Sequence, residues 1–262
     1  MPDADAVLAE DTRHSRKLLT HLGISTPLIS FHTHNEAARQ NKVLERLDAG
    51  AALALISDAG MPAISDPGAD LVAAVVQAGH RVIPIPGPSA VLSALVASGL
   101  STSEFLFAGF LPPKAGARKK RLQELADVTA TLILYAPPHS LVAILADAAG
   151  VLGSQRRCAV ARELTKLHEE VYRDTLEGAH AEFMQRAPKG EVTLVIEGAS
   201  QALVQLSDVE VETLLRQAMQ DGESASRAAK LVAESHSVSR KAAYELAMKV
   251  QDGLRADAGS GA

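Results

Sequence analysis

Short apolar runs alternate with longer amphipathic segments through most of the chain. The runs hold four to six residues and are bounded by Gly, Pro or Asp, which is typical of buried strands. We expect such strands at Leu53–Ile56, Arg81–Ile85, Thr131–Tyr135, Cys158–Arg162 and Val192–Glu197. The alternation predicts an α/β fold with mainly parallel strands, and ligands of such folds usually bind beyond the carboxyl ends of the strands.

The amphipathic segments repeat their apolar positions at helical spacing. They predict helices at Arg13–Leu22, Asn35–Ala49, Ala69–Ala78, Ala90–Ala97, Arg118–Asp127, Leu141–Ala149 and Ala179–Gln185. The pattern breaks around Ser101–Phe105, and a loop with two prolines follows at Leu111–Arg118. We therefore expect an N-terminal α/β lobe over residues 1–103 and a C-terminal α/β lobe over residues 104–200.

After Ala199 the pattern becomes wholly helical. Helices are predicted at Asp208–Gln220, Ser224–Ser235 and Ser239–Val250. Ser224 and Ser239 are suited to cap the second and third of these helices, and Gly222 is suited to end the first. We expect residues 201–262 to form a small helical tail.

Composition limits the kinds of nucleic-acid contact. The formal net charge is -5, so RNA contacts would have to come from local basic patches rather than from a general basic surface. Aromatic residues make up only 3% and Trp is absent, which argues against base stacking on aromatic platforms as the main mode of binding.

The single cysteine excludes a disulfide framework and a cysteine zinc site. Cys158 lies in a predicted buried strand, and we interpret it as a small core residue. No apolar run approaches the roughly 20 residues that span a bilayer. The first residues show neither a basic region nor a long apolar core of a signal peptide, so we expect a cytoplasmic protein.

Turn-forming residues are densest in Ile56–Gly68, directly after a predicted strand. Its glycines and prolines fix a sharply shaped loop whose backbone groups can face a ligand. Asp58 and Asp66 can accept hydrogen bonds from a ribose or an ammonium group. The alternative is a plain strand-to-helix connection in which Asp66 caps the helix.

A second stiff loop follows the next predicted strand. Three prolines and a glycine in Pro84–Ala90 leave few backbone donors, which suits an adenine or a thioether better than a pyrophosphate. Neither a GxGxxG after a strand nor a GxxxxGK[ST] motif occurs, so an enzyme that binds nucleotide phosphates is disfavoured.

Two polar segments of the N-terminal region have simple alternative explanations. Glu10 and Asp11 precede a predicted helix, where acids are favoured by the dipole. Arg13, Arg16 and Lys17 can meet phosphate or can be a solvated helix face. The histidine-rich segment His32–Glu36 lacks a metal-ligand pattern, and we expect no metal site.

Basic residues gather in two further places. Lys114–Arg121 is the most cationic stretch, and the C-terminal helices add Arg227, Lys230, Arg240, Lys241 and Lys249. Either set can follow an RNA backbone, although solvated helix surfaces would look the same.

Seven motifs occur in order along residues 7–250. They are Glu10–Arg13, Ser57–Gly68, Pro84–Ala90, Gly109–Lys114, Tyr135–His139, Ala161–Lys166 and Gly190–Val195. Together they resemble the family of ribosomal RNA small subunit methyltransferase I, within the tetrapyrrole methylase superfamily. Each motif alone is weak, but the ordered set is specific.

The resemblance implies the two-lobed tetrapyrrole-methylase-like, class III methyltransferase fold with a small C-terminal helix-turn-helix-like appendage. It implies that S-adenosyl-L-methionine binds between the lobes of a homodimer. The implied reaction is methyl transfer to the 2′-oxygen of a decoding-region cytidine of 16S ribosomal RNA in the small subunit, with no membrane partner.

The resemblance also assigns residues to roles. The donor pocket would be lined by Ser57, Asp58, Ala59, Gly60, Met61, Pro86, Gly87, Pro88, Ser89, Ala90, Tyr135, Ala136, Gly198 and Ala199. The RNA would be contacted by Arg13, Arg16, Lys114, Arg118, Lys119, Lys120, Arg162, Lys166, Arg240 and Lys241. Transfer is an in-line displacement that needs alignment and a base for the hydroxyl, with no metal required. The candidate bases, which the sequence does not rank, are Asp58, Glu10 and Glu163.

One departure from the family pattern stands out. Family members begin with a strand and a glycine loop of the form V-A-T-P-I-G-N-L, well ahead of the motif at Glu10, and here nine residues precede Glu10. We interpret this as a start placed downstream of the natural one rather than as an impaired enzyme. The alternatives are a tetrapyrrole or other small-substrate methyltransferase, a non-catalytic RNA-binding module, and, least favoured, a nucleotide-dependent oxidoreductase.

Overall fold

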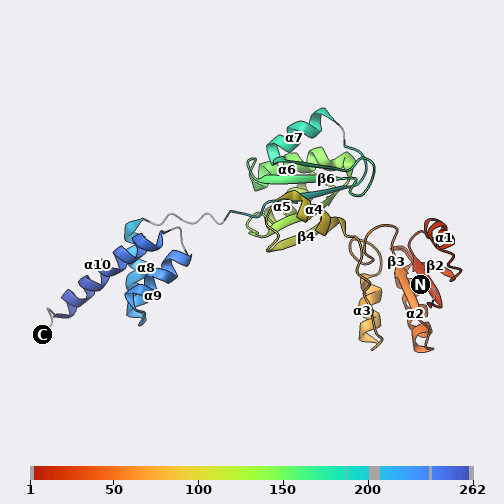
Figure 1. The fold of residues 1–262 in the computed structure, drawn as a ribbon, viewed down its shortest axis with the longest axis horizontal. Coiled ribbons are helices and arrows are strands. Elements are labelled where there is room, and N and C mark those ends of the chain that lie inside the picture. The colour runs from red at the N-terminus through yellow and green to blue at the C-terminus, as the bar shows by residue number, and fades with distance from the viewer. Residues whose placement is uncertain (1–2, 187, 201–206, 236–237, 260–262) are drawn as a thin grey trace. The chain divides into compact units, whose positions relative to one another are not determined.

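The computed structural model describes residues 3–186, 188–200, 207–235 and 238–259 of the chain. It divides into two compact units, Met1–Ala199 and Ser200–Ala262 (Figure 1). The helices of the first unit are α1 (Thr12–His21), α2 (Glu36–Asp48), α3 (Ala69–Gln77), α4 (Ala90–Ser98), α5 (Ala115–Glu124), the short 3-10 helix η1 (Pro138–Ser140), α6 (Leu141–Leu152) and α7 (Leu176–Gln185). All seven helices expected in this unit are therefore confirmed, with shifted ends.

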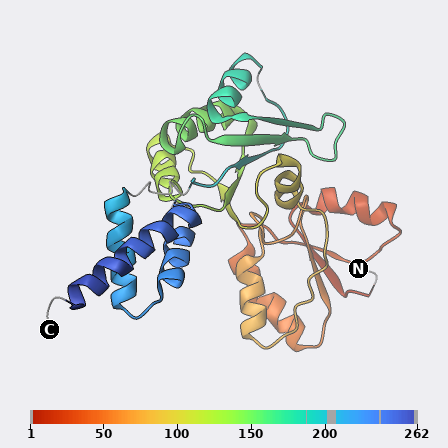
Figure 2. The same cartoon turned by 60° about the vertical axis from the view of Figure 1, so that its left-hand side comes forward.

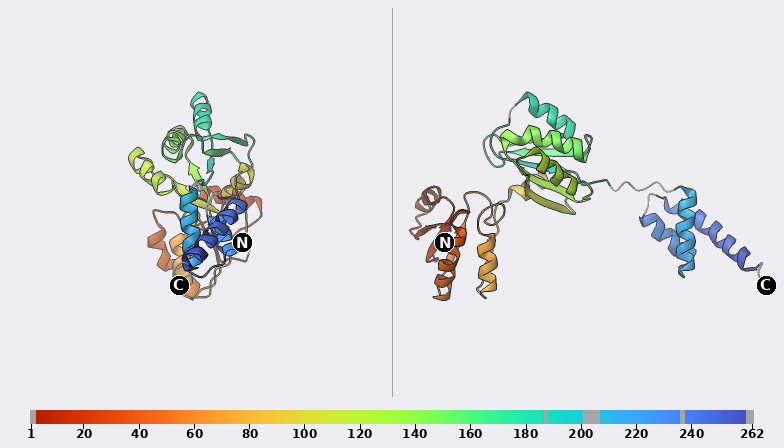
Figure 3. Two further views of the ribbon diagram at one scale, coloured as in Figure 1. Left: turned by 90° about the vertical axis from the view of Figure 1, so that its left-hand side faces the viewer. Right: turned by 180° about the vertical axis from the view of Figure 1, so that it is seen from behind.

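The first sheet of this unit has three parallel strands in the order β2-β1-β3. They are β1 (Ala6–Ala9), β2 (Leu28–Ser30) and β3 (Leu53–Ile56). Helices α2 and α3 lie side by side, as Figure 3 shows, and pack their apolar residues on the sheet around Leu8 and Phe31.

The segment Arg81–Ile85, expected to be a strand, is not one. Its apolar side chains are exposed, with Ile83 at 61% and Ile85 at 76%. β3 ends the sheet order, and no strand of the described residues pairs with its outer edge. An apolar run becomes a buried strand only when a neighbouring strand accepts its hydrogen bonds, and this segment has no such neighbour here.

The second sheet has five strands in the order β4-β5-β8-β6-β7. They are β4 (Phe105–Phe110), β5 (Thr131–Ala136), β6 (Arg157–Arg162), β7 (Glu170–Thr175) and β8 (Val192–Ile196). Only β4 and β5 pair in parallel, and the other three pairings are antiparallel. The expectation of mainly parallel strands was therefore wrong for this sheet.

Both faces of the second sheet are covered. Side chains alternate along a strand, so Leu132 and Leu134 enter the core formed with α5, α6 and α7, whereas Ile133 points to the other face. That other face is covered by α4, through Val91 and Leu95. Because α4 precedes the expected lobe boundary at residue 103 and yet packs on this sheet, the boundary stays a proposal.

Cys158 is buried in the same core. Burial, with a smaller contribution from the charge of Asp174, raises the pKa of its thiol to about 12. A thiol with so high a pKa is protonated and unreactive, so its interpretation as a core residue is confirmed.

The C-terminal unit is a cluster of three packed helices (Figure 2). They are α8 (Asp208–Gln220), α9 (Ala225–Ser235) and α10 (Arg240–Gly259). The predicted caps are confirmed, since Ser224 Oγ accepts from Arg227 N at 3.3 Å and Ser239 Oγ from Ala242 N at 3.1 Å. Gly222, with a φ of 98°, follows the end of α8 as expected. Among the described residues, no helix combines the length and apolarity needed to cross a membrane.

Candidate active site

The polar residues of the first sheet follow its strands at one edge. Glu10 comes directly after β1, His32 lies two residues beyond β2, and Ser57 and Asp58 come directly after β3. Because the three strands are parallel, their carboxyl ends meet at the same edge, where α/β folds bind ligands. The structure thus brings together two of the three candidate bases, Glu10 and Asp58.

The carboxylates at this edge are close enough for the charge of one to shift the pKa of another. Burial, and then the negative charges of Asp66 and Asp58, raise the pKa of Glu10, and the nearby His32 partly offsets this. Burial also raises the pKa of Asp66, with a contribution from Asp58 that a hydrogen bond from Ser57 opposes. In the described part of the chain, no three His, Cys, Asp or Glu side chains gather as metal ligands.

Asp66 belongs to this cluster because another residue occupies the start of α3. The N-cap of α3 is Gly68, and Glu36 Oε1 accepts hydrogen bonds from Gly68 N at 3.1 Å and Leu71 N at 3.4 Å. The alternative that Asp66 caps this helix is therefore wrong. Sequence reasoning noted Asp66 but did not include it among the catalytic candidates.

The capping explanation holds for Asp11 but not for Glu10. Asp11 accepts hydrogen bonds from Arg13 N at 2.8 Å and His14 N at 3.2 Å, and these lower its pKa. Glu10, one residue earlier, makes no capping contact to α1. Its carboxylate remains available at the strand edge.

His32 has an unsatisfied ring atom at the same edge. Asn35 Oδ1 accepts from His32 N at 2.9 Å, which orients the Asn35 amide so that its Nδ2 lies 3.1 Å from His32 Nε2. With Nε2 accepting from this amide, the uncharged tautomer carries its proton on Nδ1. This Nδ1 is buried and has no partner among the described residues, so it can donate to a ligand.

The loop between β3 and α3 has an unusual backbone. Gly60, Ala63, Ser65 and Gly68 all have positive φ values, of 73°, 69°, 61° and 122°. The φ of 122° at Gly68 favours glycine, and a Cβ there would lie 2.6 Å from Leu55 Cδ2, so that side chain would have to move. Non-glycine residues at positive φ mark stored strain of the kind found at ligand sites. In the other expected donor loop, Pro86, Gly87 and Pro88 are exposed and belong to no helix or strand, and Ser89 caps α4.

Tyr135, on the second sheet, is affected by the charge of Asp66 in the loop that follows the first sheet. It lies near the end of β5, and burial, followed by the charges of Asp66 and Glu191, raises its pKa. Its ring centroid lies 5.0 Å from the ring centroid of Phe107 and 5.3 Å from that of Phe110. The neighbouring Ala136 pairs with Val192, which pairs in turn with Arg162, so all three lie at one edge of the sheet.

Gly198 and Ala199, expected beside Tyr135, lie elsewhere. Ala199 N donates to Val128 O at 2.6 Å, and a Cβ at Gly198 would overlap the carbonyl oxygen of Thr129. These contacts precede β5, whereas Tyr135 lies near its end. The two residues are therefore separated from Tyr135 because β8 is antiparallel to β5, which the sequence pattern did not reveal.

Glu163, the third candidate base, is held in a turn. Its Oε1 accepts from Glu191 N at 2.9 Å and from Lys166 Nζ at 3.0 Å, and these contacts lower its pKa. Lys166 also contacts Glu191 at 3.2 Å. A carboxylate with a lowered pKa is a weaker base, so the contacts favour a positioning role.

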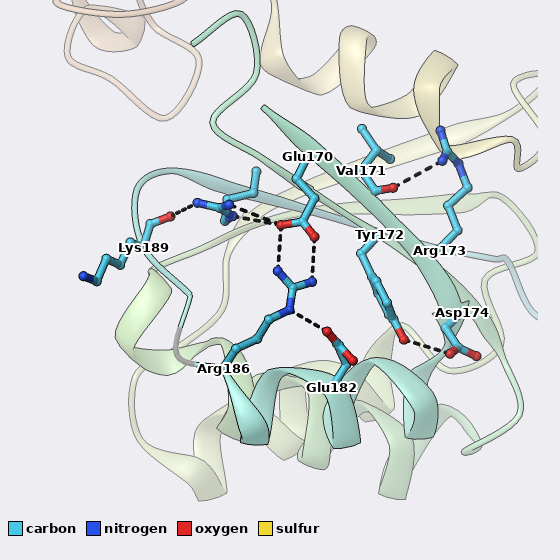
Figure 4. A network of polar contacts seen from close by, with 9 residues as sticks. Glu170, Val171, Tyr172, Arg173, Asp174, Glu182, Arg186 and Lys189 are labelled. Atoms are coloured by element: carbon cyan, nitrogen blue, oxygen red, sulfur yellow. Dashed lines mark hydrogen bonds and ion pairs between the residues drawn. The ribbon is translucent and has the colours of Figure 1, made fainter. Parts of the chain in front are cut away.

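A network on β6, β7 and α7 was missed by sequence reasoning (Figure 4). Arg186 donates to Glu170 at 2.6 and 2.9 Å and to Glu182 at 2.6 Å, as Figure 4 shows. Arg162 Nε and Nη2 also donate to Glu170, each at 3.2 Å. The network holds Arg162 at the edge of a cavity of about 340 Å³. β7 was not predicted, so nothing in the sequence placed Glu170 next to Arg186.

The basic stretch of α5 contains one structural arginine. Arg118 is only 7% exposed, pairs with Asp147 at 2.6 Å and donates to Pro113 O at 3.0 Å. Its assignment to RNA is therefore wrong, since the guanidinium joins α5 to α6. Lys119 lies 3.4 Å from Asp147 but is largely exposed, and Lys114, Lys120, Arg13 and Arg16 are exposed.

Comparisons with known proteins agree with this architecture. Residues 1–180 match the family model of the tetrapyrrole (corrin/porphyrin) methylases, and residues 205–251 match that of an RsmI C-terminal HTH domain. Solved structures share the fold: the methyltransferase CobJ superposes with a TM-score of 0.56 at 18% identity, covering 75% of this chain and 84% of that chain.

Relatives that are more similar in sequence than these solved structures share the same protein name. Ribosomal RNA small subunit methyltransferase I of Synechocystis is 46% identical over 248 residues, covering 94% of this chain and 89% of the relative. The protein of that name from Xylella fastidiosa strain Temecula1 is 44% identical over 242 residues, covering 91% and 87%.

Proposed function

Because this chain belongs to the tetrapyrrole methylase family, and within it to the ribosomal RNA small subunit methyltransferase I group, we propose that it is a 16S ribosomal RNA methyltransferase. The proposed reaction transfers a methyl group from S-adenosylmethionine to the ribose 2′-oxygen of a decoding-region cytidine, cytidine 1402. The observation that best supports a chemical site is the meeting of Glu10, Asp58 and Asp66 at the carboxyl edge of the first sheet.

The residues at this edge fit the methyl donor. S-Adenosylmethionine supplies an electrophilic methyl group on a positively charged sulfur. Carboxylates suit its ammonium and sulfonium charges, and His32 Nδ1 offers an unused donor. We assign donor binding to Ser57–Met61, Pro86–Ala90, Tyr135 and Ala136, and leave Gly198 and Ala199 out because they lie at the other end of the second sheet.

We assign the proton transfer to Glu10, assisted by Asp58. A raised pKa makes the ionised Glu10 a stronger base toward a ribose hydroxyl than an ordinary carboxylate. The loop after β3, with its positive φ values, holds Asp58 at the same edge. The negative charge of Asp58 contributes to the raised pKa of Glu10. Glu163 and Lys166 keep the turn at Glu191 in place, and Arg162 is held by Glu170.

RNA contacts of the first unit are assigned to its exposed cations. These are Arg13, Arg16, Lys114, Lys119 and Lys120. All five are exposed, whereas Arg118 is buried. Phosphate contacts of this kind position an RNA without reading its sequence. We also propose a homodimer acting in the cytoplasm, where small ribosomal subunits are found, and sedimentation velocity tests the dimer.

The test is methylation of small ribosomal subunits that lack the modification, followed by nucleoside mass spectrometry. We expect 2′-O-methylcytidine at a single site, with at least a 100-fold loss of rate for Glu10→Gln, because a positioned base contributes about 10²–10⁴-fold. Glu45→Gln is the matched control, since this side chain is exposed on α2 and has no proposed role. A base-methylated product, or methylation of a tetrapyrrole instead of RNA, would overturn the proposal.

A further inference from the structure

A groove of about 560 Å³ lies between α9 and α10 of the C-terminal unit. Its volume is within the roughly 300–1,000 Å³ of small-ligand sites. Ser226 and Lys230 of α9 line it, with Arg240, Lys241, Tyr244 and Glu245 of α10. Cations therefore line both walls, with a single carboxylate among these six side chains.

The packing of the unit explains why the groove is open and basic. The two helices meet through alanines, among them Ala228, Ala243 and Ala247, which are fully buried. Small residues at the contact put the long side chains at its rim. Arg240 and Lys241 also stand in the first turn of α10, where Ser239 caps the helix and the dipole favours an anion.

Charge is unevenly distributed within this unit. Helices α9 and α10 together contain six basic and four acidic residues, in a chain whose net charge is -5. Helix α8 instead places Asp208 and Glu210 in its first turn. The cations at the groove, Lys230, Arg240 and Lys241, make this surface complementary to a polyanion.

Tyr244 distinguishes among polyanions. Tyr244 is 47% exposed and lines the groove beside the cations, so part of its ring is accessible to a partner. An exposed aromatic ring within a cationic groove is the arrangement that binds single-stranded nucleic acid, where phosphates meet the cations and a base stacks on the ring. An acidic protein segment would use the cations but would gain little from the ring.

We propose that the groove between α9 and α10 binds an unpaired segment of RNA, with Lys230, Arg240 and Lys241 on its phosphates and Tyr244 stacked on one base. The proposal rests on the proposed function, which supplies ribosomal RNA as the substrate. It adds a second RNA site, on a unit distinct from the one that holds Glu10 and Asp58. This site would raise the affinity for the substrate without taking part in methyl transfer.

The experiment compares full-length variants in three measurements: binding to a single-stranded fragment of 16S RNA, methylation kinetics on small subunits, and calorimetric binding of S-adenosylmethionine. The variants are Arg240→Ala/Lys241→Ala, Tyr244→Leu and Tyr244→Phe. The charge-matched control is Arg216→Ala/Arg227→Ala, since neither residue lines the groove. Circular dichroism verifies that each variant is folded.

We expect the double groove variant to lose at least tenfold in RNA affinity and to lower the slope of log affinity against log salt by about 1.4, as two single-strand phosphate contacts would. Tyr244→Leu should lose about fivefold or more and Tyr244→Phe little, because stacking is kept. KM for subunits should rise, while kcat and affinity for S-adenosylmethionine stay unchanged.

Several outcomes would overturn the groove proposal and leave the proposed function intact. One is equal loss in the groove variant and the charge-matched control, which would indicate a general charge effect. Another is weaker binding to assembled subunits with unchanged binding to the RNA fragment, which would make the groove a protein contact. Loss of methylation by every form, wild type included, would instead count against the proposed function.

Discussion

At the scale of single residues, the raised pKa of Glu10 predicts opposite effects on stability and activity. A raised pKa in the folded state means that folding favours the protonated carboxyl, so this contribution to stability is lost as the pH rises through that pKa. Glu10→Gln should therefore raise the melting temperature at pH 7, while methyl transfer falls.

The gain should disappear as the pH falls below about 4.5, the ordinary value for a glutamate, because the carboxyl is then protonated in both states. Asp11→Asn is the matched control. The capping hydrogen bonds lower the pKa of Asp11, so folding favours its ionised form, and the uncharged asparagine should lose this contribution to stability at pH 7. A Glu10→Gln variant less stable than wild type at pH 7 would contradict the assigned environment.

A side chain at position 190 should clash with Glu163. The φ of Gly190 is 81°, and a Cβ there would overlap the Glu163 carboxyl group. Gly190→Ala should lower the free energy of unfolding by about 1–3 kcal/mol, the usual cost of such a conformation. Gly150→Ala is the control, because it lies inside α6 with no described atom within 4 Å of its Cβ position, and alanine should stabilise this helix by about 0.5–1 kcal/mol. Urea denaturation measures both.

Residue roles were predictable where they depend on neighbours in sequence. Asp11 as a cap and Cys158 as a core residue follow from their own segments. Asp66 did not, because the position before a helix makes it an obvious cap, and only Glu36 from α2 takes that role away. Gly198 failed for a similar reason, since the direction of β8 is set by tertiary pairing.

At the scale of elements, a buried ion pair between Arg118 and Asp147 joins α5 to α6, beside the apolar contacts that the two helices share. Arg118→Ala would leave Asp147 buried without its main partner and should cost about 3–5 kcal/mol of unfolding free energy. Lys120→Ala, two residues along on the exposed side, should change stability by less than about 0.5 kcal/mol and should weaken RNA binding. Equal stability of the two variants would contradict the pairing. The sequence showed only a run of cations here, and burial separates their roles.

The unpaired edge of β3 makes a different prediction for the segment Arg81–Ile85. Among the described residues no strand pairs with the outer edge of β3, and Ile83 and Ile85 are exposed; an open strand edge and exposed apolar side chains both favour association between molecules. Ile83→Lys/Ile85→Lys should reduce light scattering at high protein concentration. Leu167→Lys, at a side chain 93% exposed but distant from this segment in sequence, should have little effect. Unchanged scattering by the double variant would argue against association through this segment.

At the scale of the whole molecule, the order of motifs identified the family although several elements were misjudged. Loops proposed to bind the methyl donor, such as Ser57–Gly68, combine glycines, prolines and aspartates in a distinctive order. Strand partners are set by packing between distant segments, and β7 and the antiparallel β8 were accordingly missed or misdirected. The chain therefore revealed its proposed chemistry more readily than its topology.

The division into two units predicts how ligands change thermal unfolding. Each unit has its own core, and all proposed donor-binding residues lie before residue 199. S-Adenosylmethionine at 100 times its dissociation constant should stabilise the first unit by about 2.7 kcal/mol and leave the second unchanged. Differential scanning calorimetry should then show one transition that shifts and one that does not, whereas a single-stranded RNA fragment should shift the transition of the C-terminal unit. If S-adenosylmethionine moved both transitions together, the donor site would have to involve both units, and assigning donor and RNA binding to separate units would be wrong.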